Sequence, residues 1–161
     1  MVHATLCFIV RNDAVPHVLL GKKKRGFGLG KLNGIGGKLE PNELPEDGII
    51  REVEEEVGLV IPKSNLQAAG HITFRFPFME SFNHFVHVFV ATAWEGQPIE
   101  TDEMLPGWFP INEIPFERMW QDDAYWLPIV LNGKRIDADF TFGRDNETVI
   151  DWVIRGLHSP T

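Results

Sequence analysis

The chain has 161 residues and a net charge of −8, with 43% hydrophobic and 24% charged residues. This length and balance predict one globular domain, residues 1–161, with a real apolar core. The negative charge argues against binding to a nucleic-acid polymer, which favours a basic surface. No apolar run approaches the roughly 20 residues that span a bilayer, so we expect no membrane association.

The N-terminal segment MVHATLCFIVRN has an apolar run without the basic start or the cleavage site of a signal peptide. It is interpreted as a first strand. Cys7 is the one cysteine, so no internal disulfide forms, and its place in the apolar run predicts a buried, inert thiol. These features favour a reducing cytoplasm as the compartment.

The first half of the chain predicts strands over 4–10 and 15–20 and a helix over 44–57. Pro45 suits the first turn of that helix, where its missing N–H is not needed, and Gly58 suits the C-terminal cap. A basic run, Lys22-Lys23-Lys24-Arg25, precedes a glycine-rich loop. It is either a solvated turn between strands or a local positive patch for a phosphate.

The second half predicts five strands, over 70–78, 82–94, 108–109, 135–142 and 147–155. In the second of these strands both alternating sets of residues are largely apolar, which indicates a central strand covered on both faces. Asp122 is placed to cap a second, amphipathic helix. Together these elements predict a mixed sheet with two helices, an α/β (α+β) fold.

The first predicted helix carries an unfavourable arrangement of charge. Glu52, Glu55 and Glu56 fall within an arc of about 100°, beside the apolar stripe. Like charges at these spacings destabilise a helix by a few tenths of a kcal/mol each, and the dipole near the C-terminus disfavours them further. The arc is either a solvated acidic face or a site for a hard cation such as Mg²⁺ or Mn²⁺, which prefers oxygen ligands.

A longer pattern contains this helix, starting at Gly37: GKLEPNELPEDGIIREVEEEVGL. It matches the Nudix box at every defined position: Gly37, Glu43, Arg51, Glu52, Val53, Glu55, Glu56, Gly58 and Leu59. The chain is therefore identified as a member of the Nudix hydrolase superfamily. The resemblance implies a mixed sheet sandwiched between helices and a Mg²⁺-dependent hydrolase of nucleoside diphosphate linkages.

Further segments between residues 18 and 131 resemble the MutT-homologue branch: VLLGKKKRGFGLGKLNGIGGK, HVFV, TDEMLPGWF and IPFERMWQDDAYWLP. This branch contains sanitising diphosphatases for oxidised purine nucleoside triphosphates. The resemblance implies hydrolysis of substrates such as 8-oxo-dGTP and 2-oxo-dATP to monophosphate and pyrophosphate by a monomer whose partner is a small nucleotide. The alternatives are a Nudix pyrophosphatase for ADP-ribose or dinucleoside polyphosphates, and a non-catalytic nucleotide-binding module.

By resemblance, five groups ligate the metal: the Gly36 carbonyl and the carboxylates of Glu52, Glu55, Glu56 and Glu103. The three box glutamates are also the candidate catalytic residues, with Glu56 the first choice of base and Glu55 the second. Arg51 is expected to orient a box glutamate, and Glu43 to support the loop before the helix. Gly37 is expected to allow a turn that a side chain would block.

The nucleotide-binding residues assigned by resemblance are Phe27, Asn33, Phe74, Trp120, Asp122 and Asp123 for the base, and Lys23 for the phosphate tail. Two adjacent carboxylates in a partly dry pocket do not both ionise easily, so one can donate while the other accepts. Proton exchange between Asp122 and Asp123 would let one pocket accept both 8-oxoguanine and 2-oxoadenine. In the alternative interpretation, Asp122 caps its helix and Asp123 faces water.

The chain departs from the branch at five positions: Phe8, Leu32, Ile35, His84 and Phe85. These departures leave the metal ligands untouched and are expected to alter the walls of the base pocket, and with them the substrate range. His84 is interpreted either as a structural or surface residue or as a functional one.

Overall fold

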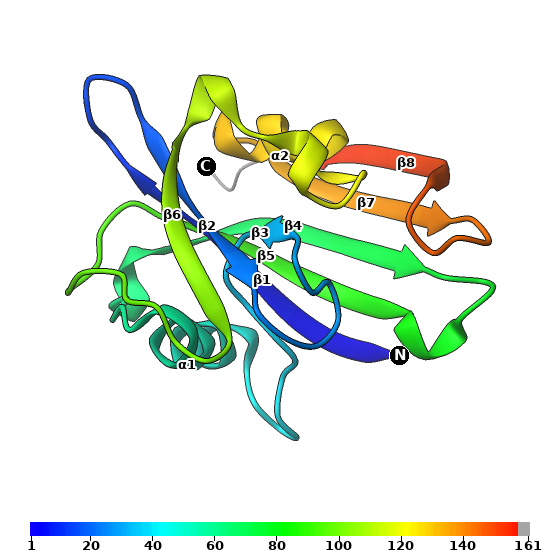
Figure 1. Ribbon diagram of the computed structural model, residues 1–161, viewed down its shortest axis with the longest axis horizontal. Helices are drawn as coiled ribbons and strands as arrows, with labels where there is room; N and C mark the ends of the chain where they lie inside the picture. The colour runs from blue at the N-terminus through cyan, green and yellow to red at the C-terminus, as the bar shows by residue number, and fades with distance from the viewer. Residues whose placement is uncertain (158–161) are drawn as a thin grey trace.

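A computed structural model describes residues 1–157, so the last four residues of the expected domain lie outside the described range. Its eight strands are β1 Val2–Arg11, β2 His17–Lys23, β3 Leu32–Asn33, β4 Leu66–Arg75, β5 His84–Ala91, β6 Met104–Pro110, β7 Arg135–Phe142 and β8 Val149–Leu157. The two α-helices are α1 Pro45–Val57 and α2 Asp123–Leu131 (Figure 1). Four single-turn 3₁₀ helices cover Lys63–Asn65, Glu80–Phe82, Ile111–Glu113 and Phe116–Arg118.

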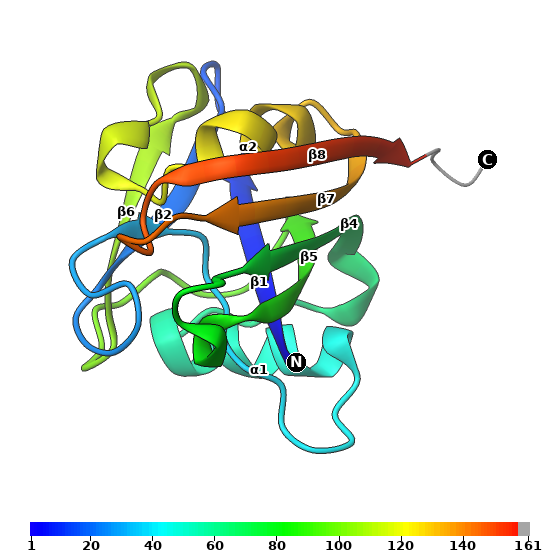
Figure 2. The same cartoon turned by 90° about the vertical axis from the view of Figure 1, so that its right-hand side faces the viewer.

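The strands form one mixed sheet in the order β3-β2-β1-β5-β4-β7-β8, and β6 pairs with β2. Two neighbouring pairs are parallel, β1 with β5 and β4 with β7, and the others are antiparallel. β5 lies between β1 and β4, so the expected central strand is confirmed. Figure 2 shows β7 and β8 continuing the sheet beyond β4.

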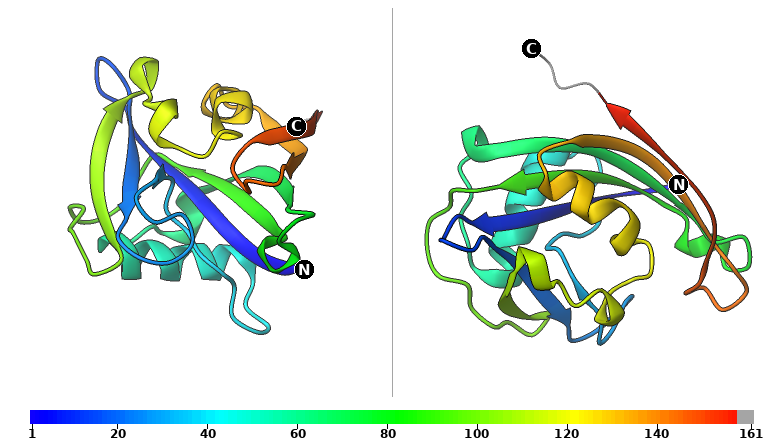
Figure 3. Two further views of the ribbon diagram at one scale, coloured as in Figure 1. Left: turned by 45° about the vertical axis from the view of Figure 1, so that its right-hand side comes forward. Right: turned by 90° about the horizontal axis from the view of Figure 1, so that it is seen from above.

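The two helices cover opposite faces of the sheet, as Figures 1 and 3 show. On β1, Cys7 and Ile9 point into the cluster that contains α1, while Phe8 and Val10 point into the cluster that contains α2. Both faces of β1 are therefore buried. The expected α/β class, a mixed sheet between helices, is confirmed. Burial raises the pKa of the Cys7 thiol to about 12, in keeping with the inert thiol that the sequence predicts.

Helix α1 begins and ends close to where the sequence predicts. Pro45 occupies its first turn, and Gly58 closes it in the left-handed conformation at φ 74°, with its N–H donated to the Glu54 carbonyl. Ile49, Val53 and Val57 pack against the sheet. The remaining buried positions of this face include two glutamates, which form part of the site below.

Helix α2 differs from the prediction in two ways. The helix is apolar around most of its circumference, because Tyr125, Ile129 and Leu131 occupy positions outside its buried face, so it is not the expected amphipathic helix. Tyr125 contacts Trp152 of β8, with 4.7 Å between ring centroids, and β8 thereby partly covers the outer side of α2. Asp122 occupies the N-cap position that the sequence predicts, but its side chain makes no cap hydrogen bond.

Several strand boundaries also differ from the prediction. β4 covers Leu66–Arg75 where 70–78 is predicted, and β5 covers His84–Ala91 where 82–94 is predicted. β2 extends to Lys23, which places Lys22 and Lys23 inside a strand instead of a turn. β6 covers seven residues where a two-residue strand is predicted, because its backbone pairs with all of β2. Within residues 1–157, no helix combines the length and the apolar character that a membrane crossing requires.

Candidate active site

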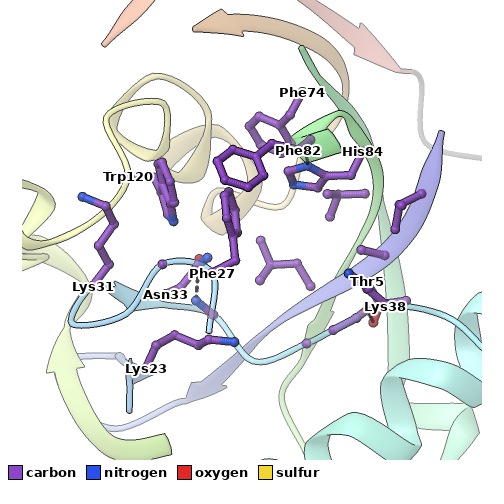
Figure 4. Close-up of a pocket in the computed structure, with 18 of the residues that line it drawn as sticks. Thr5, Lys23, Phe27, Lys31, Asn33, Lys38, Phe74, Phe82, His84 and Trp120 are labelled. Atoms are coloured by element: carbon purple, nitrogen blue, oxygen red, sulfur yellow. Dashed lines mark hydrogen bonds between the residues drawn. The ribbon is translucent and has the colours of Figure 1, made fainter. Parts of the chain in front are cut away.

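A cavity of about 580 Å³ lies where β1, β2, β5, α1 and the start of α2 meet. Every site residue predicted from the sequence except Glu55 lines it: Lys23, Phe27, Asn33, Gly36, Glu52, Phe74, Glu56, Glu103, Trp120, Asp122 and Asp123. We call Gly36, Gly37, Glu52, Glu56 and Glu103 its acidic end. We call Phe27, Phe76, Phe82, Trp120 and Phe142 its aromatic end. Phe27 lies between Trp120 on one side and Phe82 and His84 on the other (Figure 4).

Two glutamates of α1 are buried at the acidic end. Glu52 is 9% and Glu56 2% exposed, and Glu56 Oε2 has no hydrogen-bond partner among residues 1–157. Burial raises the pKa of Glu56 to about 8, with a further contribution from the negative charge of Glu52, while the positive charge of Lys23 opposes the shift. A buried acceptor without a donor is costly in free energy, so this end is built for a positive group.

Arg51 fixes the orientation of the glutamates around it. It donates from Nε and Nη2 to the two carboxylate oxygens of Glu43, at 2.8 and 2.9 Å, and from Nη1 to Glu52 Oε1 at 2.9 Å. This bidentate bond is the main reason that the pKa of Glu43 falls to about 2. Glu43 also accepts the N–H of Glu40 at 3.0 Å, so one ion-pair network joins the loop, the helix and Glu52.

The glycines before α1 are required by close contacts. A Cβ at Gly37 would lie 2.6 Å from Cδ of Glu52, and a Cβ at Gly36 would lie 1.9 Å from the Thr5 carbonyl oxygen. Neither glycine has a positive φ, so no left-handed turn forms at Gly37, but the predicted exclusion of a side chain there is confirmed. A side chain is excluded there because Glu52 approaches the backbone closely.

The donor chemistry of the acidic end fits a hard divalent cation, because carboxylate and carbonyl oxygens face one cavity. Within the described range, no three acidic, histidine or cysteine side chains lie close enough together to hold a metal ion as they stand. Arg51 holds Glu55 at 3.2 Å, and Arg25 holds Glu103 at 3.1 Å. These two ion pairs must loosen before all five predicted ligands can reach one ion.

At the aromatic end, Phe27 stacks on Trp120 with ring centroids 5.0 Å apart and planes at 21°. Phe82 meets Phe27 edge-on at 4.7 Å. A base inserted between two rings needs them roughly 7 Å apart, twice the optimal contact distance between carbon atoms. A base can therefore reach the face of Trp120 that Phe27 covers only when Phe27 moves away from it.

Asp122 and Asp123 are both buried, each 2% exposed, and both line the cavity. Asp122 Oδ2 accepts the indole N–H of Trp126 at 2.7 Å, while Asp123 Oδ2 has no hydrogen-bond partner within residues 1–157. Burial raises the pKa of Asp122 to about 6. The pKa of Asp123 is raised well above its usual value by burial and by the charge of Asp122. The alternative of a helix cap beside a water-facing carboxylate is wrong.

A family model described as "NUDIX domain" matches residues 1–129 of the chain. The chain belongs to the Nudix family. It is 43% identical over 142 residues to the oxidized purine nucleoside triphosphate hydrolase of Mus musculus, covering 88% of each protein. Its identity to the protein of that name from Danio rerio is 48% over 125 residues, or 78% of each. The solved structure of a MutT protein from Bacillus halodurans shares the fold, with a TM-score of 0.81, 23% identity and coverage of 96% of this chain and 97% of that one.

Of the five departures from the MutT-homologue pattern, only His84 lines the cavity of this Nudix chain. Phe8, Leu32 and Ile35 are buried in the two core clusters, and Phe85 contacts His3 at 5.2 Å between ring centroids. Phe8 packs against Trp126, behind the cavity wall. The expectation that Phe8, Leu32, Ile35 and Phe85 form pocket walls is wrong, because none of these four side chains lines the cavity.

Sequence reasoning missed several lining residues: Thr5, Lys31, Lys38, Phe76, Phe82 and Asn83. Lys31 lies with its ammonium 4.9 Å from the centre of the Trp120 ring. Of the basic run 22–25, only Lys23 lines the cavity, because Lys24 pairs with Glu100 and Arg25 with Glu103. The cluster of phenylalanines around residues 74–82 is the signal that could have indicated Phe76 and Phe82. The sequence alone does not show which residues these rings would contact.

Proposed function

We propose that this Nudix chain hydrolyses oxidised purine nucleoside triphosphates, such as 8-oxo-dGTP and 2-oxo-dATP, to the monophosphate and pyrophosphate. One observation carries the proposal: a single cavity joins the buried glutamates of the Nudix box to an aromatic end with two buried aspartates. The first end suits phosphates with a cation, and the second suits a flat base with polar edges. The names of the mouse and zebrafish relatives support this substrate class.

At the acidic end, Glu52, Glu55, Glu56, Glu103 and the Gly36 carbonyl would hold Mg²⁺, or Mn²⁺ in its place. Such an ion neutralises phosphate charge and lowers the pKa of bound water. Glu56 is the proposed base, with Glu55 the second choice, because Glu56 lines the cavity and its Oε2 has no hydrogen-bond partner among residues 1–157. Lys23 lies on the same cavity wall and would hold the phosphate tail.

At the aromatic end, the polar edge of the base would meet three side chains. Asn33 accepts the N–H of Gly34 through Oδ1 at 2.8 Å, which leaves its amide hydrogens for the ligand. Asp122 and Asp123 would share protons, one donating and one accepting, because burial opposes the ionisation of both. That exchange would serve both 8-oxoguanine and 2-oxoadenine. Phe27, Phe74 and Trp120 would contact the faces of the base.

We further propose that residues 1–161 act as one catalytic domain, a cytoplasmic monomer that removes oxidised nucleotides before they enter DNA. The net charge of −8 supports a small nucleotide as the partner, in preference to a nucleic-acid polymer. The single buried cysteine is compatible with a reducing compartment.

The test measures pyrophosphate release from a nucleotide panel with Mg²⁺ and with a chelator. The panel contains 8-oxo-dGTP, 2-oxo-dATP, dGTP, ADP-ribose and a dinucleoside tetraphosphate, with product analysis for the last two. The expected result is metal-dependent release that is fastest for the two oxidised purines. Faster turnover of ADP-ribose or of the dinucleotide would move the chain to another Nudix activity. Binding without turnover of any compound would identify a non-catalytic module.

A further inference from the structure

His84 is the one departure from the MutT-homologue pattern whose side chain lines the cavity. It is the first residue of β5, opposite Phe74 of β4. Its ring stacks on Phe74 with centroids 4.9 Å apart and planes at 25°, and Phe27 meets it edge-on at 6.0 Å (Figure 4). The imidazole is therefore held in a fixed orientation in the wall of the proposed base pocket.

The hydrogen bond that His84 makes determines its tautomer. Nδ1 lies 2.6 Å from the carbonyl oxygen of Phe82. A carbonyl oxygen can only accept, so Nδ1 carries the hydrogen. Burial lowers the pKa of His84, so the ring is neutral near pH 7 and Nε2 keeps its lone pair.

The surroundings of Nε2 make this lone pair selective. Nε2 makes no hydrogen bond to any residue of the range 1–157 in the structure. The rings around the imidazole are apolar, with Phe74, Phe76 and Phe27 all within 6.2 Å between centroids. In such surroundings a ligand N–H opposite an acceptor is stabilised, while a ligand lone pair opposite it is repelled and left without a partner.

We propose that His84 Nε2 accepts a hydrogen bond from the edge of the base and selects purines that present an N–H at that point. The inference rests on the proposed function and deepens it. Oxidation of guanine at C8 places a hydrogen on N7, which carries a lone pair in the unmodified base. One fixed acceptor therefore distinguishes 8-oxoguanine from guanine through the sign of a single contact.

The test compares kcat/KM for 8-oxo-dGTP and dGTP in the full chain and in two variants. His84→Phe keeps an aromatic ring on Phe74 and removes Nε2, and it is expected to lower the 8-oxo-dGTP to dGTP ratio about tenfold. His87→Phe is the matched control on the same strand. His87 is three positions along β5, so it projects from the opposite face, where it contacts His3. The ratio of this control is expected to equal that of the unmodified chain.

A purely structural His84 would lower both rates alike and leave the ratio intact in His84→Phe, which would overturn the inference while oxidised-purine hydrolysis stands. If the unmodified chain hydrolyses neither nucleotide, the inference and the proposed function both fall. Should His84→Phe not fold, ¹⁵N NMR of the unmodified chain decides. Nε2 is expected to resonate as an unprotonated nitrogen and to shift upfield with 8-oxo-dGMP but not with dGMP. Equal responses to the two monophosphates would refute the proposal.

Discussion

The two ends of the cavity differ in how far apart their residues lie in the sequence. The acidic end takes most of its groups from one continuous segment, since Gly36, Gly37, Glu52 and Glu56 all lie within or just before α1. The aromatic end brings together Phe27 and Trp120, which lie in two separate loops, and Phe82, the last residue of a 3₁₀ helix. The chemistry of the acidic end is therefore a local property of one motif, while the shape of the aromatic end depends on the whole sheet.

The two ends also differ in the contacts that hold them in place. At the acidic end, a bidentate ion pair between Arg51 and Glu43 holds the loop against the helix. At the aromatic end, the Phe27 loop contains glycines with positive φ at 26, 28 and 30, and its contacts are ring against ring. We infer that the acidic end sets the reaction, and that the aromatic end adapts to the base.

The largest effect is expected from removing the proposed base of the acidic end. Glu56→Gln keeps the shape of the side chain but cannot accept a proton, so kcat is expected to fall by about a thousandfold, in the range for loss of a general base. Binding of 8-oxo-dGMP, measured by calorimetry in Mg²⁺, is expected to change by only a few-fold. The control is Glu54→Gln, an exposed glutamate of the same helix, with near-normal turnover. Near-normal turnover of Glu56→Gln itself would remove Glu56 from the mechanism.

The next largest effect concerns Asp122 and Asp123, whose raised pKa values keep protons on them at a pH where an ordinary Asp has lost its proton. The folded-state pKa of Asp122 is about 6, above its usual value of 3.8. Between pH 4 and 6 the folded state therefore binds more protons than the unfolded state, and this contribution to stability is lost as pH rises through 6. The shift of about 2 units corresponds to about 3 kcal/mol over the whole titration, of which about 2 kcal/mol is lost between pH 4.5 and 7.5. Urea denaturation at pH 4.5 and 7.5 is expected to show this loss in the unmodified chain and a smaller loss in Asp122→Asn.

Asp139 supplies a control for that measurement, because its pKa is shifted in the opposite direction to that of Asp122. Its carboxylate accepts hydrogen bonds from Arg75 and Arg155, which lower its pKa. Its contribution is present above the unfolded pKa of 3.8 and is lost as pH falls below that value, so Asp139→Asn is expected to reduce stability by similar amounts at pH 4.5 and pH 7.5. If stability depends on pH equally in the Asp122→Asn and Asp139→Asn variants, the raised pKa of Asp122 is not the cause of the loss in the unmodified chain.

A smaller effect is expected from loosening the network that positions Glu52. Arg51→Lys keeps the charge but loses the two parallel bonds to Glu43. We expect kcat/KM to fall about tenfold and the apparent Mg²⁺ affinity to weaken, the usual range for groups that orient metal ligands. Arg155→Lys is the matched control, because Arg155 pairs with Asp137 and Asp139 on an exposed part of the sheet. If the two variants have the same activity, the acidic end does not depend on this network.

The two ends also differ in how well the sequence predicts them. The acidic end could largely be predicted, while much of the aromatic end could not. Pro45, Gly58 and the box spacing placed α1 and its glutamates, because a helix converts sequence spacing directly into direction. The side chain of Asp122 could not be placed, since its orientation is set by the Trp126 indole and by burial under the sheet. Phe8, Leu32 and Ile35 were assigned to the pocket wrongly, because strand alternation does not reveal which face a distant helix will cover.

The smallest effect is expected from Phe27, and it tests whether the aromatic end rearranges when a base binds. Phe27 is 43% exposed and covers Trp120, so a base that stacks on Trp120 must first replace an existing contact. Base–aromatic stacking contributes about 1–3 kcal/mol, but the displaced Phe27 contact offsets part of it. Phe27→Ala is therefore expected to weaken 8-oxo-dGMP binding by only about threefold, and Trp120→Ala by more. Phe78→Ala, an exposed phenylalanine outside the cavity lining, is the control with unchanged affinity. A loss in Phe27→Ala that equals the loss in Trp120→Ala would mean that both rings hold the base equally, and that the stack seen between them has no energetic consequence for binding.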